Sequence, residues 1–255
     1  MSFGIGSYLI VTGLLFLAGI VDAIGGGGGL ISLPAFLIVG VPPHMAVATN
    51  KLSAATGTLL AVIRFIKNDL ISLKLAIPSC TAAMIGSFLG SKVSLLIPES
   101  YFNIILVIML PIAAFLVLNK KLFKDNGKEV LVVEKKTYIT ATVAALFIGF
   151  YDGFYGPGTG TFLLIAFTVF AHLSVKHSNA NAKIINCTTN ITALVVFATS
   201  GKVLVLLGLV GAVANLFGGY IGSSLAMSKS NKVTKPVIIF VLLLLAIKVI
   251  REYFF

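Results

Sequence analysis

The sequence predicts an all-α integral membrane protein with two internal repeats. Of its 255 residues, 58% are hydrophobic and only 11% are charged, whereas a soluble domain carries about 25% charged residues. The hydrophobic runs are continuous, which favours transmembrane helices over the alternating strands, about 10 residues long, of a barrel. Glycine clusters interrupt two of these runs at matching places, and this observation predicts the repeats.

Five hydrophobic segments make up the first half of the chain. Five consecutive glycines, Gly25–Gly29, separate the first segment from the second. Because glycine costs about 1 kcal/mol relative to alanine inside a helix, we expect the helix to break there. Pro42 and Pro43 end the second segment, and a slight break is expected at Pro78 in the fourth. The segments cover residues 8–24, 30–41, 45–66, 70–97 and 101–118.

The second half repeats this pattern. A glycine-rich stretch, Tyr155–Gly160, interrupts its first hydrophobic run. A transmembrane span needs roughly 20 apolar residues, and the pieces beside the glycines are shorter. Each broken run is therefore either one discontinuous helix or two separate segments, which gives a total of eight or ten segments. In this half they cover residues 138–154, 161–173, 180–199, 203–227 and 236–250.

A polar linker, residues 119–137, separates the predicted first repeat, residues 1–118, from the second, residues 138–255. The linker contains six lysines, and the positive-inside rule places it in the cytoplasm. The same rule accounts for the net charge of +11, so the basic residues do not indicate a nucleic acid as partner. The sequence predicts a multi-pass protein of the cell membrane, with the lipid bilayer around it.

Matched landmarks in the two halves support the repeat. Four of them recur in the same order, at an offset of 130 residues that later becomes 132: the glycine clusters, Asp22 with Asp152, Lys51 with Lys183, and GSFLGS at 86–91 with GGYIGS at 218–223. The last pair has the small-residue spacing that suits close helix contacts. With five crossings per half the repeats are inverted, and with four they are parallel. The inverted arrangement is favoured, because the uncharged N-terminus suits an outside start.

Asp22 and Asp152 lie just before the two glycine clusters. An ionisable residue inside a membrane segment indicates a functional site. A low-dielectric cavity disfavours the charged carboxylate, so either aspartate would take up and release a proton near neutral pH. The alternative is structural, in that each carboxylate caps backbone amides that the glycine break leaves free. The sequence leaves both interpretations open.

Lys51 and Lys183 lie within apolar spans, where a buried ammonium group needs a partner or a cavity. One interpretation is an anion site, to which each half contributes one lysine. A second is structural pairing within each half, Lys51 with Asp22 and Lys183 with Asp152. A third is that both lysines extend from near a helix end to the lipid headgroups.

Polar residues and glycines accompany these charges in the sequence. Amides and hydroxyls hydrogen-bond an oxyanion, and the backbone amides exposed at glycine breaks attract anions. Alternatively, the polar side chains form interhelical hydrogen bonds, which are worth about 0.6 kcal/mol on average. Besides the two lysines, the predicted substrate-binding residues are Thr49, Asn50, Asn181, Asn186, Thr189, Asn190, Gly26, Gly28, Gly156, Gly158 and Thr159.

At these residues the sequence resembles the sulfite exporter TauE/SafE family of membrane transporters, and the resemblance covers nearly the whole chain. It implies export of sulfite or a small organosulfonate, coupled to the proton gradient. The elements that carry it are Gly19-x-x-Asp22 with the glycine run, Ala48-Thr49-Asn50-Lys51, Gly149-x-x-Asp152 with Gly156-Pro157-Gly158-Thr159-Gly160, Asn181-Ala182-Lys183, and Thr189-Asn190.

Two other classes of protein compete with this prediction. An intramembrane aspartyl protease needs two carboxylates that share a proton, but both aspartates precede their glycines here and no Pro-Ala-Leu element occurs. A passive anion channel or uniporter stays open as an alternative, since it needs no proton carrier. The sequence predicts a small-anion transporter with no enzymatic activity, cofactor or metal, in which Lys51 and Lys183 attract the substrate and Asp22 and Asp152 couple protons.

Overall fold

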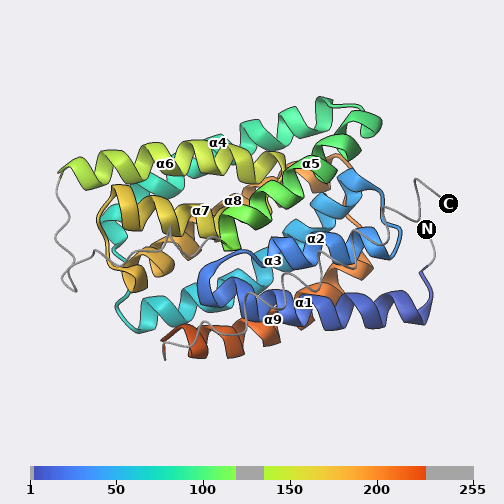
Figure 1. The fold of residues 1–255 in the computed structure, drawn as a ribbon, viewed down its shortest axis with the longest axis horizontal. Coiled ribbons are helices and arrows are strands. Elements are labelled where there is room, and N and C mark those ends of the chain that lie inside the picture. The colour runs from blue at the N-terminus through green and yellow to red at the C-terminus, as the bar shows by residue number, and fades with distance from the viewer. Residues whose placement is uncertain (1–2, 119–134, 228–255) are drawn as a thin grey trace.

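The computed structural model describes residues 3–118 and 135–227 (Figure 1). Within these two ranges the chain is almost entirely helical and contains no β-strand. In chain order the elements are α1 (Ile5–Gly25), α2 (Gly29–Ile38), α3 (Pro43–Lys67), α4 (Leu73–Leu96), α5 (Glu99–Leu118), α6 (Lys135–Phe154), α7 (Thr159–Ile165), the π-helix η2 (Ala166–Phe170), α8 (Val175–Thr199) and α9 (Val205–Met227).

Six of these helices are long and apolar enough to cross a membrane: α1, α3, α4, α6, α8 and α9. Each is at least 20 residues long, which at 1.5 Å per residue matches a hydrocarbon core about 30 Å thick. The prediction of an all-α membrane protein is therefore confirmed.

The two glycine-broken runs each fold as separate helices. α1 is followed by α2, which turns back along it, and α6 is followed by α7 (Figure 1). The alternative of one discontinuous helix is therefore wrong for these runs. The reason is local, because the glycines at each break reverse the direction of the chain rather than merely interrupting its hydrogen bonds.

Other predicted boundaries differ less. The break expected at Pro78 is wrong, since α4 continues from Leu73 to Leu96 with that proline inside it. Pro78 lies in the second turn, where a proline removes a single backbone donor from the helix. α6 begins at Lys135, three residues before the predicted segment. The segment predicted at 236–250, and the linker up to residue 134, lie outside the described residues.

The two halves run in opposite directions along the long axis of the molecule. In Figure 1, α1 begins at the right-hand end and α6 begins at the left-hand end, and α3 and α8 are likewise opposed. Both halves share one order of elements, namely a long helix, a glycine break, a short helix and two long helices. The opposite directions are what an inverted repeat requires, although the repeat itself stays a prediction.

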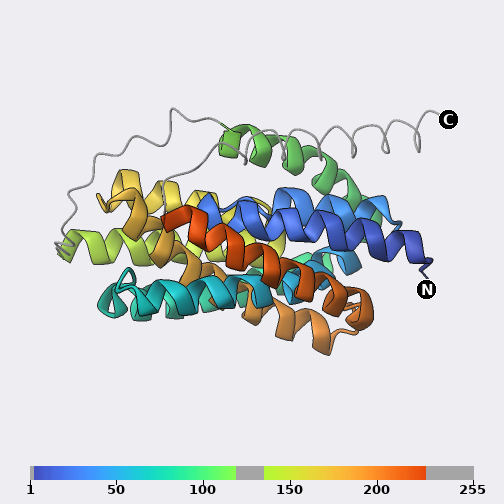
Figure 2. The same ribbon diagram turned by 90° about the horizontal axis from the view of Figure 1, so that it is seen from below.

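Helices from opposite halves pack most closely at glycines. α1 packs against α9, and α4 against α6 (Figure 2). At four glycines of the motifs at 86–91 and 218–223, a Cβ atom would overlap a backbone carbonyl of the facing helix, so the small-residue spacing does give the close contacts that were predicted. These contacts are Gly86 with Leu146, Gly90 with Phe150, Gly218 with Phe16, and Gly222 with Ile20. The first two contacts match the last two at the sequence offsets of 132 and 130.

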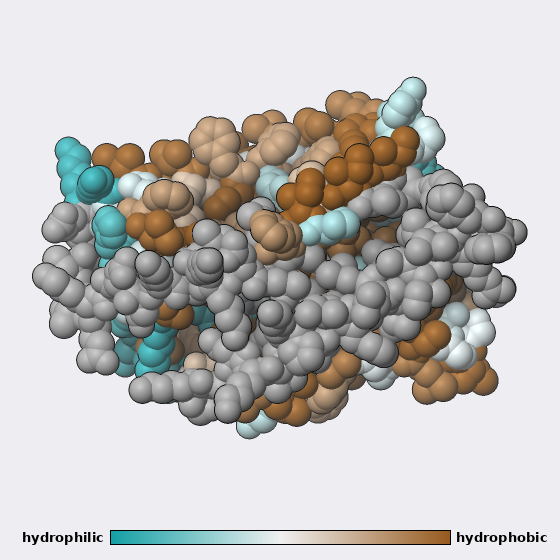
Figure 3. All heavy atoms as spheres, viewed as in Figure 1, coloured by the Kyte–Doolittle hydropathy of each residue, from teal (hydrophilic) through white to brown (hydrophobic). Residues whose placement is uncertain are grey.

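The outer surface is apolar, as a lipid-facing surface must be. Large exposed hydrophobic side chains lie on every long helix, among them Leu9, Ile77 and Phe147. In Figure 3, hydrophobic residues extend along the upper edge of the molecule and part of its lower edge, and the most hydrophilic of the coloured residues gather at the left end, where α6 begins. The interior is less uniform, because Lys51 and Lys183 are among the largest fully buried side chains.

Candidate functional site

The two glycine breaks lie against each other between the halves. The hydroxyl of Thr161 donates to the carbonyl of Gly25 at 3.0 Å. A Cβ atom at Gly29 would lie 2.9 Å from the Cα atom of Pro157, so only glycine allows this approach. The hydroxyl of Tyr151 donates to the Pro157 carbonyl at 2.6 Å and holds the second break in place.

Positive φ angles produce the sharp turn at each break. They are 81° at Gly26, 86° at Gly27, 104° at Gly156 and 90° at Gly158. A residue with a Cβ atom is strained in this left-handed region, whereas glycine adopts it readily. The glycine clusters are thus a requirement of the backbone path.

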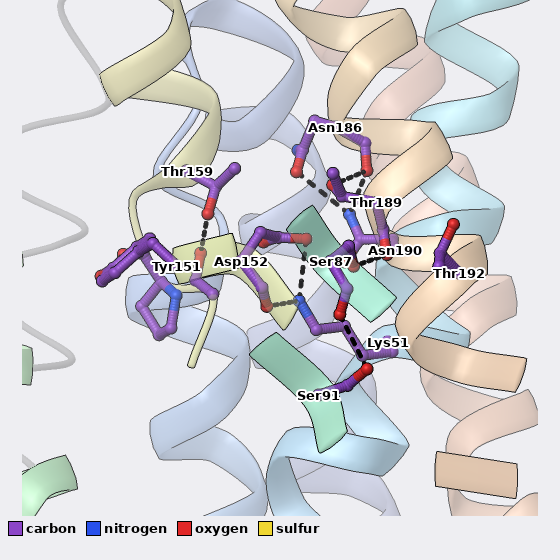
Figure 4. Close-up of polar contacts among 12 residues, drawn as sticks. Lys51, Ser87, Ser91, Tyr151, Asp152, Thr159, Asn186, Thr189, Asn190 and Thr192 are labelled. Carbon is purple, nitrogen blue, oxygen red and sulfur yellow. Dashed lines mark hydrogen bonds and ion pairs between the residues drawn. The ribbon is translucent and has the colours of Figure 1, made fainter. Parts of the chain in front are cut away.

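The first ion pair joins Lys51 of α3 to Asp152 of α6 (Figure 4). Lys51 Nζ lies 3.0 Å from Asp152 Oδ2, and the two side chains are 1% and 2% exposed. Nζ also donates to the backbone carbonyl of Asp152. That carbonyl belongs to the last turn of α6, where carbonyl groups have no partner within the helix. Lys51 is therefore held by two oxygens of the same residue.

The second ion pair joins Lys183 of α8 to Asp22 of α1, with 2.8 Å between Nζ and Oδ2. Lys183 is 1% exposed, but the Asp22 side chain is 18% exposed. The backbone N–H of Gly28 donates to Asp22 Oδ1 at 3.4 Å. Asp22 thus pairs with a lysine and also caps the glycine break, which fits the structural interpretation, and its role as a proton carrier stays a prediction.

Both ion pairs connect opposite halves of the chain, so the predicted alternative of pairing within each half is wrong. Because the two breaks face each other and α3 packs against α8, each lysine meets the aspartate of the other half. The alternative in which the lysines reach the headgroups is also wrong, since both lysines are fully buried. Removing one partner of such a pair would leave a buried charge uncompensated.

A small polar cavity adjoins both ion pairs. Its volume open to the centre of a water molecule is about 20 Å³, which is room for roughly one water. Side chains from both halves and both glycine breaks line it. The lining residues that the sequence predicted are Asp22, Gly28, Asn50, Lys51, Asp152, Gly156, Gly158, Thr159, Asn186 and Asn190.

The other predicted binding residues lie outside the cavity lining. Lys183 is connected to the cavity by its ion pair with Asp22, which lines it. Gly26 packs against the second glycine break. The Thr49 hydroxyl accepts from the backbone N–H that precedes α9, at 3.0 Å. The Asn181 side chain accepts from the backbone N–H that precedes α4, at 3.2 Å. The Thr189 hydroxyl donates to a carbonyl of its own helix. These three contacts fit the structural interpretation of the polar side chains.

Sequence reasoning missed part of the lining. Three of the missed residues belong to the glycine clusters, and their neighbours were predicted. Asn215 is different, because it is a single asparagine in an apolar segment and no motif surrounds it. The missed residues are Gly27, Gly29, Ser32, Ala54, Gly160 and Asn215.

The fold and the site together define the class of this protein, a multi-pass helical membrane protein with a charged polar cavity between its halves. Comparison with known families then gives the identification. Residues 11–249 match the family described as "Sulfite exporter TauE/SafE". The chain belongs to this family, which confirms the resemblance seen in the sequence, and it is a membrane transporter.

Similar proteins agree with this assignment. The chain is 34% identical over 239 residues to "Probable membrane transporter protein ORF9" of Sinorhizobium sp, a match that covers 93% of this chain and 90% of the relative. It is 33% identical over 250 residues to "Probable membrane transporter protein YfcA" of Escherichia coli K12, with 95% and 91% covered. No significant match occurs among solved structures.

Proposed function

We propose that the protein is a secondary transporter that exports a small anion from the cytoplasm across the cell membrane. The anion is sulfite or an organosulfonate, and its export is coupled to protons. The observation that carries this proposal is the pair of buried lysine–aspartate contacts, each of which joins the two halves beside one polar cavity. The family name supports the choice of substrate.

The charges around the cavity explain why an anion and a proton would move together. Two ammonium groups face two carboxylates, so the site is neutral without substrate. An entering anion competes with an aspartate for its lysine. The released carboxylate is then a buried charge without a partner, which is costly, and protonation removes that cost. Anion binding and proton uptake therefore favour each other.

Alternating access would follow from movement of one half against the other. Both ion pairs and both glycine breaks lie at the boundary between the halves, so this movement would open the cavity first to one side and then to the other. The present cavity, with room for roughly one water, corresponds to a closed state in this scheme. The protein then acts as a carrier and has no enzymatic step.

Flux measurements in liposomes that contain the purified protein test the proposal. Sulfite, a set of small sulfonates and a set of carboxylates would be followed with and without a pH gradient. We expect gradient-dependent movement of a sulfur oxyanion. Flux that is indifferent to the gradient would instead favour a uniporter or channel, and movement of carboxylates alone would overturn the choice of substrate.

Variants of two lysines connect the flux to the site. Lys183→Gln removes the charge that attracts the anion, so we expect flux to fall to the level of empty liposomes. The matched control is Lys92→Gln, because Lys92 is an exposed lysine of α4 that does not line the cavity. Undiminished flux in folded Lys183→Gln protein would contradict the assignment of this lysine.

A further inference from the structure

An asparagine outside every motif lies in the wall of the cavity. Asn215, on α9, is 5% exposed and lines the cavity together with Asp22 and Asn50. Its side chain forms no hydrogen bond with any residue in the ranges 3–118 and 135–227. Its polar atoms are not among the fully enclosed ones that lack a partner, so an amide in this apolar helix that borders the cavity requires an explanation.

Two glycines from two other helices make room for this amide. A Cβ atom at Gly57 of α3 would overlap Asn215 Oδ1, and a Cβ atom at Gly19 of α1 would lie 2.9 Å from the same oxygen. The oxygen is thus packed against backbone on one side. The amide nitrogen carries two donor hydrogens, and the side chain borders the cavity.

Helix packing alone does not explain the asparagine. At the sequence offset of 132, Asn215 corresponds to Ala83 and Gly57 corresponds to Thr189. Ala83 lies against Gly149 of α6 in the other half. At these two positions the first half therefore has the smaller residues, Gly57 and Ala83, and the second half has the larger ones, Thr189 and Asn215. The alanine shows that this kind of helix contact forms without a buried amide.

We propose that Asn215 is a substrate-binding residue, whose amide nitrogen donates a hydrogen bond to an oxygen of the anion held in the cavity. The amides of Asn50 and Asn186 line the same cavity from α3 and α8. Neutral donors hold an oxyanion without changing the balance of charges in the two ion pairs. This inference rests on the proposed function, because it takes the cavity to be the anion site.

The experiment compares Asn215→Ala with the double variant Gly57→Thr/Asn215→Ala in flux measurements with sulfite and a sulfonate. The double variant places at both positions the residue found at the matching position, Thr189 or Ala83, and so compensates the lost volume. Because a hydrogen bond to a charged group is lost, we expect KM to rise about 10-fold or more in both variants. The maximal rate should change less, and the double variant should regain thermal stability that Asn215→Ala loses.

Two further variants sharpen the result. Asn215→Asp has the same shape but presents a negative charge to the cavity, so its KM should exceed that of Asn215→Ala. Asn68→Ala is the matched control, since Asn68 is an exposed asparagine at the end of α3, and its KM should equal that of the unchanged protein.

The possible outcomes separate the two proposals. An unchanged KM in the folded double variant would overturn the role of Asn215 and leave the transport function standing. A KM for Asn215→Asp below that of Asn215→Ala would also contradict the role of the amide as donor. If the unchanged protein moves none of the tested anions, the proposed function fails, and the inference about Asn215 fails with it.

Discussion

The two lysine–aspartate pairs come from matching positions in the two halves, yet their surroundings differ. Lys51 and Asp152 are both almost fully buried, and the lysine also bonds to the Asp152 backbone. In the other pair, Lys183 is equally buried, but Asp22 is 18% exposed and its second oxygen accepts from the backbone of the break. In the first pair both side chains are buried, and in the second pair the aspartate is accessible to water.

This difference suggests a division of roles between pairs that the sequence presents as equivalents. The fully buried pair, in which Lys51 contacts both the carboxylate and the backbone carbonyl of Asp152, is suited to holding the halves together. A pair with a partly exposed carboxylate is suited to exchanging a proton or giving up its lysine to an anion. The comparison makes predictions in which the same substitution in the two halves has different consequences.

The largest effect is expected on stability, from Lys51→Met compared with Lys183→Met. Lys51→Met leaves Asp152 buried without a partner, and breaking a buried pair in this way costs about 3–5 kcal/mol. Lys183→Met should cost less, because Asp22 keeps its contact with Gly28 and its access to water. Thermal unfolding of both purified variants in detergent measures the difference. Equal losses of stability would show that the two pairs have the same structural role.

The next effect concerns proton coupling, from Asp22→Asn compared with Asp152→Asn. An amide cannot take up the proton, so Asp22→Asn protein should still fold but should move anions without dependence on the pH gradient. Asp152→Asn should mainly lower the yield of folded protein. Flux in liposomes with and without a gradient provides the measurement. The assignment is reversed if Asp152→Asn protein folds and loses coupling while Asp22→Asn protein keeps it.

The helices were predictable from the sequence because their signals are local. Continuous apolar runs, glycines and prolines place nine of the segments within a few residues of the observed elements. The breaks were predictable too, since five successive glycines are unsuited to a helix interior. The break predicted at Pro78 was wrong, because one proline near the start of a long, well-packed helix removes a single backbone donor, and this loss does not end the helix.

The partners of the charged residues were not predictable in the same way. Asp22 is closer in sequence to Lys51 than to Lys183, which favours pairing within one half. The actual pairing follows from how the halves pack, with the two breaks in contact, and no local pattern contains that information. Asn215 illustrates the same limit, because only its comparison with Ala83 in the other half reveals an amide where an apolar residue would fit.

The smallest effect is expected at an interaction that only one half has. Arg64, at the end of α3, donates to the hydroxyls of Ser223 and Ser224 on α9 at 2.8 and 2.9 Å and lies 4.5 Å above the ring of Tyr220. At the offset of 132 the matching residue is Val196, which cannot make such contacts. Arg64→Ala should therefore cost only about 1 kcal/mol of stability, measured by thermal unfolding.

Lys67→Ala is the matched control for this last comparison, because Lys67 is an exposed residue one turn further along the same helix, and its loss should leave stability unchanged. If Arg64 only fastens α3 to α9, the rate of anion flux at saturation should rise or stay constant in Arg64→Ala protein, while KM keeps its value. A rise in KM would mean that the arginine acts on the anion itself, and the difference between the halves would then extend beyond the ion pairs.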